Sequence, residues 1–223
     1  MGRKIEFQRP DGANSAAYLA EADSSEGLKR PGLILIQEWW GLNPQICGVA
    51  DRFAAAGFTT LAPDLYRGRQ ASNADEATHL KSGLDFADAT HQDLAGALAF
   101  LLQHCSKVGV SGFCMGGALT IAAAVHLQGL SAASCFYGIP PAELADPAKI
   151  TIPFQGHFAE QDDWCTPAAA DALQAQLAPS AEMHRYAAQH GFFNEQRPEV
   201  YDAASAELAW QRTLAFLGKN LVA

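Results

Sequence analysis

Apolar and polar positions along this chain follow two periods, one that suits β-strands and one that suits α-helices. Strand-like segments lie at 32–37, 58–62, 107–113, 132–137, 150–157 and 182–187. Helical spacing occupies the stretches between and after them, at 44–56, 93–103, 118–125, 167–178 and 203–217. The first strand-like segment is apolar almost throughout, as in a strand that is covered on both faces. Strands that alternate with helices predict an α/β fold, with a mainly parallel central sheet and helices on both of its faces.

The amino-terminal segment has a different pattern. Residues 4–8 alternate between polar and apolar, Asp11-Gly12 is a turn signal, and residues 16–22 return in extended form, which predicts an antiparallel hairpin. The polar stretch 68–89 is compatible with a helix or a loop. Because the chain shows no repeat, linker or low-complexity segment, we expect a single domain over residues 1–223.

Composition narrows the class of protein. The 223 residues are 49% apolar and 17% charged, and the net charge of −9 comes from dispersed acidic residues, which disfavours a nucleic-acid partner. No run is long enough to cross a bilayer, and residues 1–4 lead into a polar strand pattern instead of a signal peptide. Five cysteines without CxxC spacing argue against a disulfide framework and a zinc site. We therefore expect a cytoplasmic protein without metal or cofactor, as a monomer or small homo-oligomer.

The segment 107–117 carries the strongest chemical signal. An apolar, β-prone run ends at Cys114, glycines stand two residues before and two after this cysteine, and a helix-compatible run follows at once. Glycines allow a tight strand-to-helix turn that exposes a nucleophile, and the new helix presents free N–H groups to it. Most cysteines are buried core residues, which is our interpretation of the other four, but the glycines favour a catalytic thiol at Cys114.

A catalytic thiol needs a base and a group that orients the base. In α/β-hydrolases these groups follow the nucleophile in the order acid, then histidine, each after the carboxyl end of a strand. The strand at 150–157 leads to Asp162, with Asp163 as the alternative acid, and the strand at 182–187 leads to His190. His157 lies at the expected end of its strand, and we interpret it as a structural residue and not as the catalytic base. The sequence therefore predicts a triad of Cys114, Asp162 and His190.

A second candidate cluster, Glu38-Trp39-Trp40, follows the first central strand. In this kind of fold the loop at that place supplies one N–H of the oxyanion hole, and the residue after the nucleophile supplies the other. That assigns the backbone amides of Trp39 and Met115. A carboxylate beside an apolar run is costly unless it is exposed or has a partner. Glu38 therefore either ends the strand in water or faces Cys114, where it would hold the proton of the thiol.

Together these motifs resemble the dienelactone hydrolases, or carboxymethylenebutenolidases, over nearly the whole chain. The motifs are, in order, Gln37-Glu38 with Gly41, Pro63–Tyr66, Gly112–Gly117, Gly156-His157 with Asp162, His190–Phe192, and Arg212–Leu214 with Phe216-Leu217. The resemblance implies an α/β-hydrolase fold in which Cys114 attacks the carbonyl carbon of a lactone while Asp162 holds His190 in position. It also implies that Glu38 engages the thiol at rest and takes its proton when substrate binds.

Some positions depart from the family's pattern. The founding members bind the carboxylate of the substrate with two arginines, but here one of these positions is Asn194 and residues 70–104 contain no arginine. The candidate substitutes are Arg197, Arg67 and Arg69. Of these we predict substrate contact for Arg197, together with Trp40. The loop after the triad acid is one residue longer than usual, and a glycine replaces the serine that usually follows the triad histidine.

We expect hydrolysis of a small-molecule lactone or ester of the dienelactone type through an acyl-enzyme on Cys114. The missing arginines suggest a first alternative, a hydrolase of the same fold that acts on another small ester or thioester. The second alternative is a peroxide-sensitive thiol at Cys114, with Cys105 or Cys135 as its resolving partner. A binding module has only the pair Trp39-Trp40 in its favour, and these rings suit a pocket wall or the core.

Overall fold

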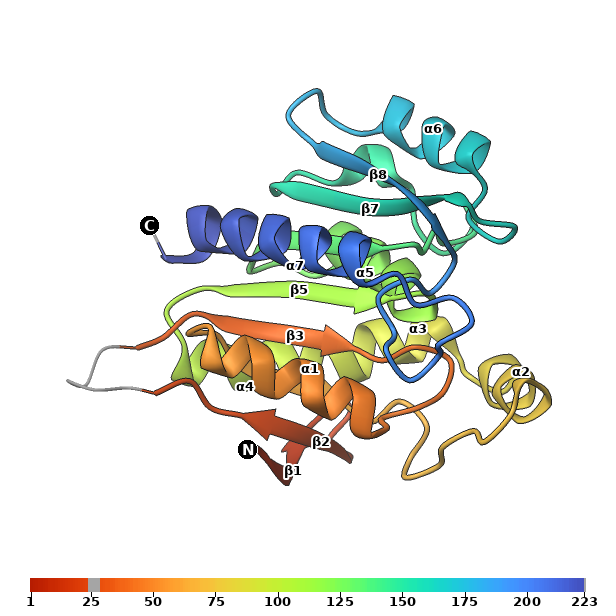
Figure 1. Ribbon diagram of the computed structural model, residues 1–223. Helices are drawn as coiled ribbons and strands as arrows, with labels where there is room; N and C mark the ends of the chain where they lie inside the picture. The colour runs from red at the N-terminus through yellow and green to blue at the C-terminus, as the bar shows by residue number, and fades with distance from the viewer. Residues whose placement is uncertain (24–28, 223) are drawn as a thin grey trace.

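The computed structural model describes residues 1–23 and 29–222, and one sheet extends through it (Figure 1). Within the described residues the strand order is β1-β2-β4-β3-β5-β6-β7-β8. β1 and β2 form the expected hairpin and β2 pairs antiparallel with β4, whereas the pairs from β4 onward are parallel. The strands are β1 Arg3–Gln8, β2 Asn14–Ala20, β3 Gly32–Ile36, β4 Thr59–Pro63, β5 Val108–Phe113, β6 Leu130–Phe136, β7 Phe154–Gln161 and β8 Glu182–Gln189.

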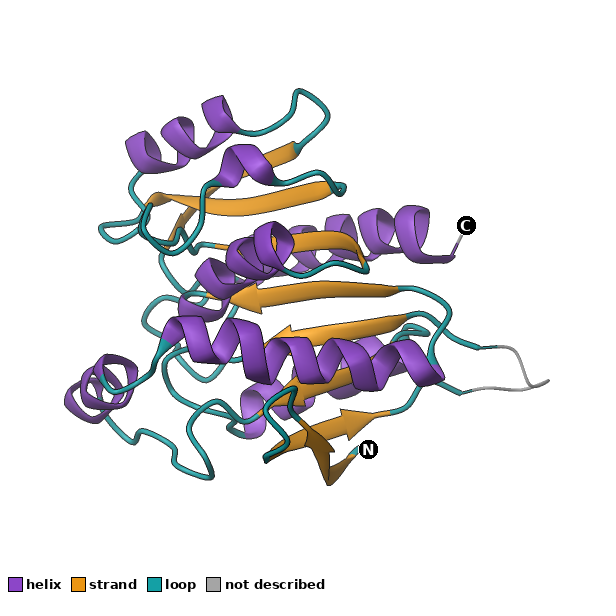
Figure 2. Ribbon diagram, turned by 180° about the vertical axis from the view of Figure 1, so that it is seen from behind, coloured by secondary structure: helices purple, strands orange, loops and turns teal. Residues whose placement is uncertain are grey.

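Helices cover both faces of the sheet (Figure 2). The helices are α1 Pro44–Ala55, α2 Ala74–Ser82, α3 Phe86–Asp88, α4 Ala95–His104, α5 Met115–His126, α6 Pro167–Gln176 and α7 Ala203–Leu217. α1 and α7 pack on one face, and their apolar side chains, such as Phe53 and Phe216, belong to one core. α4, α5 and α6 pack on the other face and contribute Leu101, Leu119 and Leu173 to a second core. No helix within the described residues is long and apolar enough to span a membrane.

β3 illustrates why a central strand of this sheet is apolar throughout. Successive side chains of a strand point to opposite faces of the sheet. Leu33 and Leu35 accordingly enter the core under α1 and α7. Ile34 and Ile36 enter the core under α4 and α5. Since both faces are covered, no position of this strand tolerates a polar side chain without a buried partner.

Parallel strands bring distant residues to one edge of the sheet. β3, β5, β7 and β8 run in the same direction, so the loops that follow their carboxyl ends open at the same edge. Glu38, Cys114, Asp162 and His190 lie in these loops. In Figure 1 the arrowheads of these strands mark that edge, beyond which α2 projects.

Among the boundaries that differ from the prediction, two lie beside the expected site. The strand expected at 150–157 is β7, which begins only after Pro153, because a proline has no N–H to donate to a sheet ladder. His157 therefore lies inside this strand and not at its end. The helix expected from residue 118 begins at Met115, so Gly116 and Gly117 belong to its first turn. That early start places the amino terminus of α5 directly after Cys114.

The polar stretch 68–89 contains α2 and α3, and α3 continues through a π-helical turn, Ala89–Leu94, into α4. The helical segment expected from residue 93 thus begins earlier, at Phe86. Asp93 is buried in the π-helical turn and accepts two hydrogen bonds of 2.9 Å from Arg67. Arg9 forms a second ion pair with it at 3.4 Å. Two arginine partners satisfy a carboxylate that would otherwise be costly to bury, and they tie the hairpin region to the helix.

Candidate active site

Cys114 occupies a sharp turn between β5 and α5, with φ 55° and ψ −115°. A non-glycine residue with such a positive φ is strained, and strained turns of this kind expose a nucleophile. At positions 116 and 117, just after this turn, there is no room for a side chain. A Cβ atom on Gly116 would lie 2.5 Å from the carbonyl oxygens of Ile36 and Gln37, and one on Gly117 would collide with the carbonyl oxygen of Phe136. The glycines therefore allow α5 to begin against the end of the sheet.

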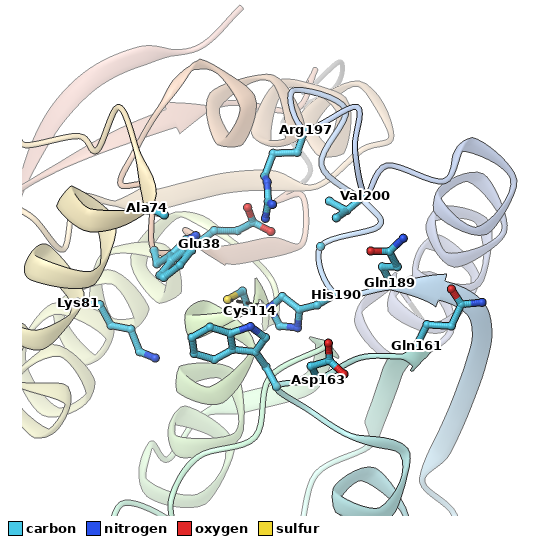
Figure 3. A pocket seen from close by; sticks show the side chains of 13 residues that line it. Glu38, Ala74, Lys81, Cys114, Gln161, Asp163, Gln189, His190, Arg197 and Val200 are labelled. Atoms are coloured by element: carbon cyan, nitrogen blue, oxygen red, sulfur yellow. Dashed lines mark hydrogen bonds between the residues drawn. The ribbon is translucent and has the colours of Figure 1, made fainter.

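The loops after β5, β7 and β8 bring three polar side chains into a line. Asp162 Oδ2 lies 2.7 Å from His190 Nδ1, and His190 Nε2 lies 3.1 Å from Cys114 Sγ. Figure 3 shows the Cys114 sulfur beside the His190 ring at the base of a pocket. These are the three residues that the sequence predicts as a triad. The geometry suits transfer of a proton between the thiol and an imidazole that a carboxylate orients.

Hydrogen bonds set the charge of His190. Burial by itself lowers the pKa of this imidazole, but hydrogen bonds to Asp162 and Cys114 outweigh that effect and raise the pKa to about 10. Burial alone would raise the pKa of Asp162. The hydrogen bond to His190, the positive charge of His190 and two backbone N–H groups outweigh that effect, so the pKa is lowered overall. The arrangement therefore favours an imidazolium held between a carboxylate and the sulfur.

The two adjacent carboxylates after β7 have different surroundings. Asp162 is buried, and its Oδ1 accepts hydrogen bonds from the backbone N–H groups of Trp164 and Cys165 at 2.7 and 2.8 Å. Those bonds leave Oδ2 directed at His190. Asp163 is exposed and lines the pocket rim (Figure 3). Position in the loop therefore favours Asp162 as the residue that orients the imidazole.

Glu38 is buried, and its carboxylate has two hydrogen-bond donors. The Tyr137 hydroxyl donates to Oε1 at 3.2 Å, and the Asn194 amide donates to Oε2 at 2.7 Å. Burial raises the pKa of Glu38, although the Asn194 amide, the charge of His190 and the Tyr137 hydroxyl each oppose the increase. The Cys114 thiol meanwhile faces His190. In this structure Glu38 is thus a buried carboxylate with two partners and not a strand end in water, and its engagement of the Cys114 thiol stays a prediction.

The two expected oxyanion donors lie in the turn after β3 and at the first residue of α5. Met115 is the first residue of α5, so its N–H is among the helix N–H groups that have no intrahelical partner. Trp39 follows Glu38 in the turn after β3. Gly41 closes that turn with φ 95°, and its N–H donates to the Glu38 carbonyl oxygen at 3.2 Å. Trp39 lines the same cavity as Cys114, and Met115 directly follows Cys114 in the chain.

A cavity of about 330 Å³ opens above Cys114, which is large enough for a small-molecule substrate. Two cations line it: Lys81 from α2 and Arg197 from the loop after His190 (Figure 3). Trp39 and Trp164 provide apolar walls. Trp40 does not line this cavity. Its ring lies beneath the Arg197 guanidinium, with 5.5 Å between the ring centroid and Arg197 Cζ.

The other two candidate arginines have different partners. Arg67 bonds to Ser15 and Asp93. The Arg69 Nε donates to the carbonyl oxygen of Tyr66. Of the three arginines predicted as substitutes, Arg197 is therefore the one that lines the cavity.

The remaining cysteines do not favour a redox device. Cys105 packs beside Gly32, at the start of β3, whereas Cys114 lies beyond the carboxyl ends of the strands. Cys135 is buried in β6, and burial raises its pKa. Its thiol donates to the carbonyl oxygens of Gly117 and Gly138. Neither of the proposed resolving partners is therefore an accessible thiolate near Cys114.

Asp162, Cys165 and His190 each present one ligand atom within 4.8 Å of the other two. Metal ions bind the thiolate form of cysteine. Burial, chiefly, raises the pKa of Cys165 to about 12, and its thiol donates to the Tyr137 carbonyl oxygen at 3.3 Å. Since Asp162 and His190 also bond to each other, this group is better suited to orienting the triad than to holding an ion.

Comparison with known proteins shows to which family the chain belongs. The model of the dienelactone hydrolase family matches residues 15–221. The chain belongs to the dienelactone hydrolase family. It is 33% identical to Protein usf of Aquifex pyrophilus, over 99% of this chain and all of that protein. It is 32% identical to a protein of Escherichia coli K12 provisionally named carboxymethylenebutenolidase, over 91% of this chain and 82% of the other.

Solved structures show the same fold. A crystal structure of a Klebsiella pneumoniae protein provisionally named dienelactone hydrolase superposes with a TM-score of 0.85 at 26% identity, over 98% of this chain and 99% of that one. A dienelactone hydrolase-like promiscuous phosphotriesterase from metagenomic libraries superposes with a TM-score of 0.84 at 22% identity, over 99% and 98%. The predicted α/β-hydrolase fold and family are confirmed. Membership supports hydrolysis of an ester or lactone bond.

Sequence reasoning missed four residues of this dienelactone hydrolase family site. Asn194 was noted only for the arginine it replaces, yet it binds Glu38. Tyr137, the other donor to Glu38, had a signal in its position directly after β6. Lys81 lies in the segment searched only for arginine, and Trp164 lies two residues after the triad acid; both line the cavity.

Proposed function

We propose that this member of the dienelactone hydrolase family cleaves an ester or lactone bond of a small molecule through an acyl-enzyme on Cys114. The observation that carries the proposal is the hydrogen-bonded line from Asp162 through His190 to the Cys114 sulfur at the base of a cavity. The thiolate is the nucleophilic form of cysteine, and an adjacent imidazolium stabilises its charge.

The reaction follows from the positions of these groups. The Cys114 thiolate attacks the carbonyl carbon, and the developing oxyanion accepts hydrogen bonds from the N–H groups of Trp39 and Met115. His190 then donates its Nε2 proton to the leaving oxygen as the C–O bond breaks, which leaves a thioester on Cys114. Water attacks the thioester carbonyl carbon as His190 takes the proton from that water. The C–S bond then breaks, which releases the acid product and returns the Cys114 thiolate beside the His190 imidazolium. Asp162 keeps the Nδ1–H of His190 in the productive orientation throughout.

Glu38 has a separate role in this proposal. Its carboxylate is held by Tyr137 and Asn194, so it fixes the turn that carries the Trp39 N–H. The family resemblance adds that Glu38 engages the thiol at rest and takes its proton as substrate binds. That exchange requires the carboxylate to leave both donors, and it stays a prediction.

The lining of the cavity supports a substrate that carries a carboxylate, as a dienelactone does. Lys81 and Arg197 both line the cavity above the nucleophile. The Arg197 guanidinium is already paired with Glu199 at 2.8 Å, whereas Lys81 lies 5.3 Å from the Trp164 ring centroid. Lys81 is therefore the cation that we assign to the substrate carboxylate, with Arg197 as the second contact.

The test replaces the nucleophile. Cys114→Ala abolishes turnover of dienelactone and of p-nitrophenyl acetate while the protein stays folded, and Cys47→Ala, at a half-buried thiol outside the cavity, leaves turnover unchanged. Mass spectrometry of the wild type after rapid quenching detects an acyl adduct on the peptide that contains Cys114. Full activity in folded Cys114→Ala would refute the proposal.

Two measurements separate the alternatives. If an uncarboxylated ester or a thioester is turned over as well as dienelactone, and Lys81→Met changes neither rate, the carboxylate assignment is wrong although the hydrolase assignment stands. If peroxide yields a stable intramolecular disulfide at Cys114 and no acyl adduct forms with any ester, the protein is a redox thiol.

A further inference from the structure

Trp164 is the most exposed aromatic side chain beside the nucleophile. Its exposed fraction is 66%, although it lines the cavity above Cys114 and follows the triad acid by two residues. An exposed aromatic ring that lines a cavity beside a candidate reactive group is available to a ligand, since ligand pockets are lined mainly by apolar and aromatic side chains. On the basis of the proposed ester hydrolysis, we propose that Trp164 is a platform for the leaving group and selects substrates whose leaving group is planar and conjugated or aromatic.

Three neighbours hold the Trp164 ring in place. The Trp39 ring meets it edge-on at 5.8 Å between centroids, and the His190 ring lies 6.4 Å away at an interplanar angle of 38°. The Lys81 ammonium lies 5.3 Å from the Trp164 centroid. The backbone N–H of Trp164 also donates to Asp162 at 2.7 Å. A ring that is restrained before binding loses little conformational freedom on contact with a ligand, so its exposed surface is preorganised.

Proton transfer decides which part of the substrate the ring contacts. His190 must donate its proton to the leaving oxygen, so that oxygen lies within hydrogen-bond distance of Nε2 at the moment of cleavage. The atoms attached to the leaving oxygen then extend past the imidazole toward the exposed ring. Two aromatic rings lie against the His190 ring: Tyr137, at 5.1 Å between centroids, is buried, and Trp164, at 6.4 Å, lines the cavity. The acyl carbon, by contrast, is bonded to Cys114 Sγ in the acyl-enzyme. Trp164 therefore contacts the leaving group.

A flat conjugated leaving group gains more at this platform than a flexible alkyl one. It stacks on the indole in the offset or edge-on arrangements that aromatic pairs prefer, and it orders no rotatable bonds as it does so. An enol or phenol meets this requirement, and its low basicity also suits departure from a thiol adduct. Ethyl and other small alkoxide groups have no flat face and too little area to cover the ring.

The test uses acetate esters that share one acyl group and differ in the alcohol: ethyl, phenyl and 2-naphthyl acetate. For each ester the kcat/KM of Trp164→Ala is divided by that of the wild type, which removes the intrinsic reactivity of the ester. We expect a decrease of about tenfold for 2-naphthyl acetate and less than twofold for ethyl acetate. A second series with one alcohol, ethyl acetate against ethyl phenylacetate, should show equal ratios.

Controls separate this inference from the function and from folding. Trp164→Phe keeps a ring and should retain most of the 2-naphthyl preference, Trp164→Leu keeps apolar bulk and should lose it, and Leu208→Ala, at an exposed residue outside the cavity, should change nothing. An equal decrease for every ester, or a larger effect in the acyl series, would overturn the platform while Cys114-dependent hydrolysis persists. Hydrolysis that survives in Cys114→Ala overturns the proposed function instead.

Discussion

The Glu38 carboxylate shows how single side chains set the chemistry of this site. It is buried, its pKa is raised chiefly by burial, and it has only neutral hydrogen-bond donors, Tyr137 and Asn194. A charged donor at position 194 would stabilise the carboxylate far more than an amide does. The neutral donors therefore oppose the increase in the pKa of Glu38 less than an arginine at position 194 would.

Asn194→Leu tests this arrangement. The substitution removes the amide hydrogen bond that lowers the pKa of Glu38, so the pKa rises further and the acid limb of the kcat/KM profile moves to higher pH. The lost hydrogen bond also costs about 1–3 kcal/mol of unfolding free energy. The measurements are a pH–rate profile and urea denaturation, with Gln196→Ala as the neighbouring control. A profile that superposes on that of the wild type would contradict an ionised Glu38 in the reaction.

Adjacent carboxylates offer a matched pair of variants. Asp162→Asn removes the acceptor that orients His190 and raises its pKa, so we expect kcat to fall by up to about 10⁴. Asp163→Asn changes an exposed rim residue, and we expect kcat within about twofold of wild type because surface substitutions have small effects. Steady-state kinetics on one ester decide the matter. A larger loss for Asp163→Asn would reassign the triad acid.

At the scale of elements, the turn between β5 and α5 depends on glycine for space. Gly116→Ala would place a Cβ 2.5 Å from the backbone oxygens of Ile36 and Gln37, and backbone at the end of a central strand cannot move aside without a large cost in free energy. We expect a loss of about 1–3 kcal/mol in unfolding free energy and a larger loss of activity, since Cys114 shifts with the helix. Urea unfolding and esterase kinetics measure both.

Gly48 supplies the matched control for that substitution. It lies inside α1, and no heavy atom stands within 4 Å of the Cβ that alanine would add there. Gly48→Ala should therefore stabilise the protein by up to about 1 kcal/mol, because alanine has the higher helix propensity. If both substitutions have the same effect, close packing is not what requires glycine at position 116.

The sequence predicted the elements that position the site residues, and periodicity explains this success. Apolar runs marked β3 and β5, and the glycines around Cys114 marked the turn. The boundaries of β7 were wrong because apolar residues before Pro153 pack in the core without joining the sheet. Asn194 and Tyr137 were missed as partners of Glu38, since a contact between residues 156 positions apart leaves no trace in local pattern.

At the scale of the whole molecule, a buried polar network joins β7, β8 and α7. His157 Nδ1 bonds to the Tyr186 hydroxyl at 2.7 Å, and Nε2 bonds to the Gln155 side-chain oxygen at 2.9 Å and to the Thr213 hydroxyl at 3.0 Å. Burial lowers the pKa of His157 well below its ordinary value of 6.5, and the nearby His184 and Arg212 add to the decrease. The network holds the strand that ends at the triad acid.

This network predicts a pH dependence of stability. Below the ordinary pKa of 6.5 the unfolded chain binds a proton at His157 that the native protein does not, so unfolding free energy falls as pH decreases through that value. The slope attributable to one such group is at most about 1.4 kcal/mol per pH unit. His157→Gln should remove that part of the slope, whereas His79→Gln, at an exposed histidine, should not. Urea unfolding at pH 5, 6, 7 and 8 gives the comparison, and parallel curves for wild type and His157→Gln would contradict it.

The sequence alone was enough to predict the class of fold, which the structure confirms, and Cys114 as the candidate reactive group, because periodicity and the spacing of glycines around Cys114 are local properties of the chain. The surroundings of Glu38, the place of Lys81 beside Arg197 in the cavity, and the exposure of Trp164 became known only from the tertiary structure. Each of these depends on loops from different strands that meet at one edge of the sheet. Burial and hydrogen bonding at that edge set the pKa of Glu38 and decide which side chains line the cavity. Both depend on residues that are distant in sequence, so local sequence patterns do not reveal them.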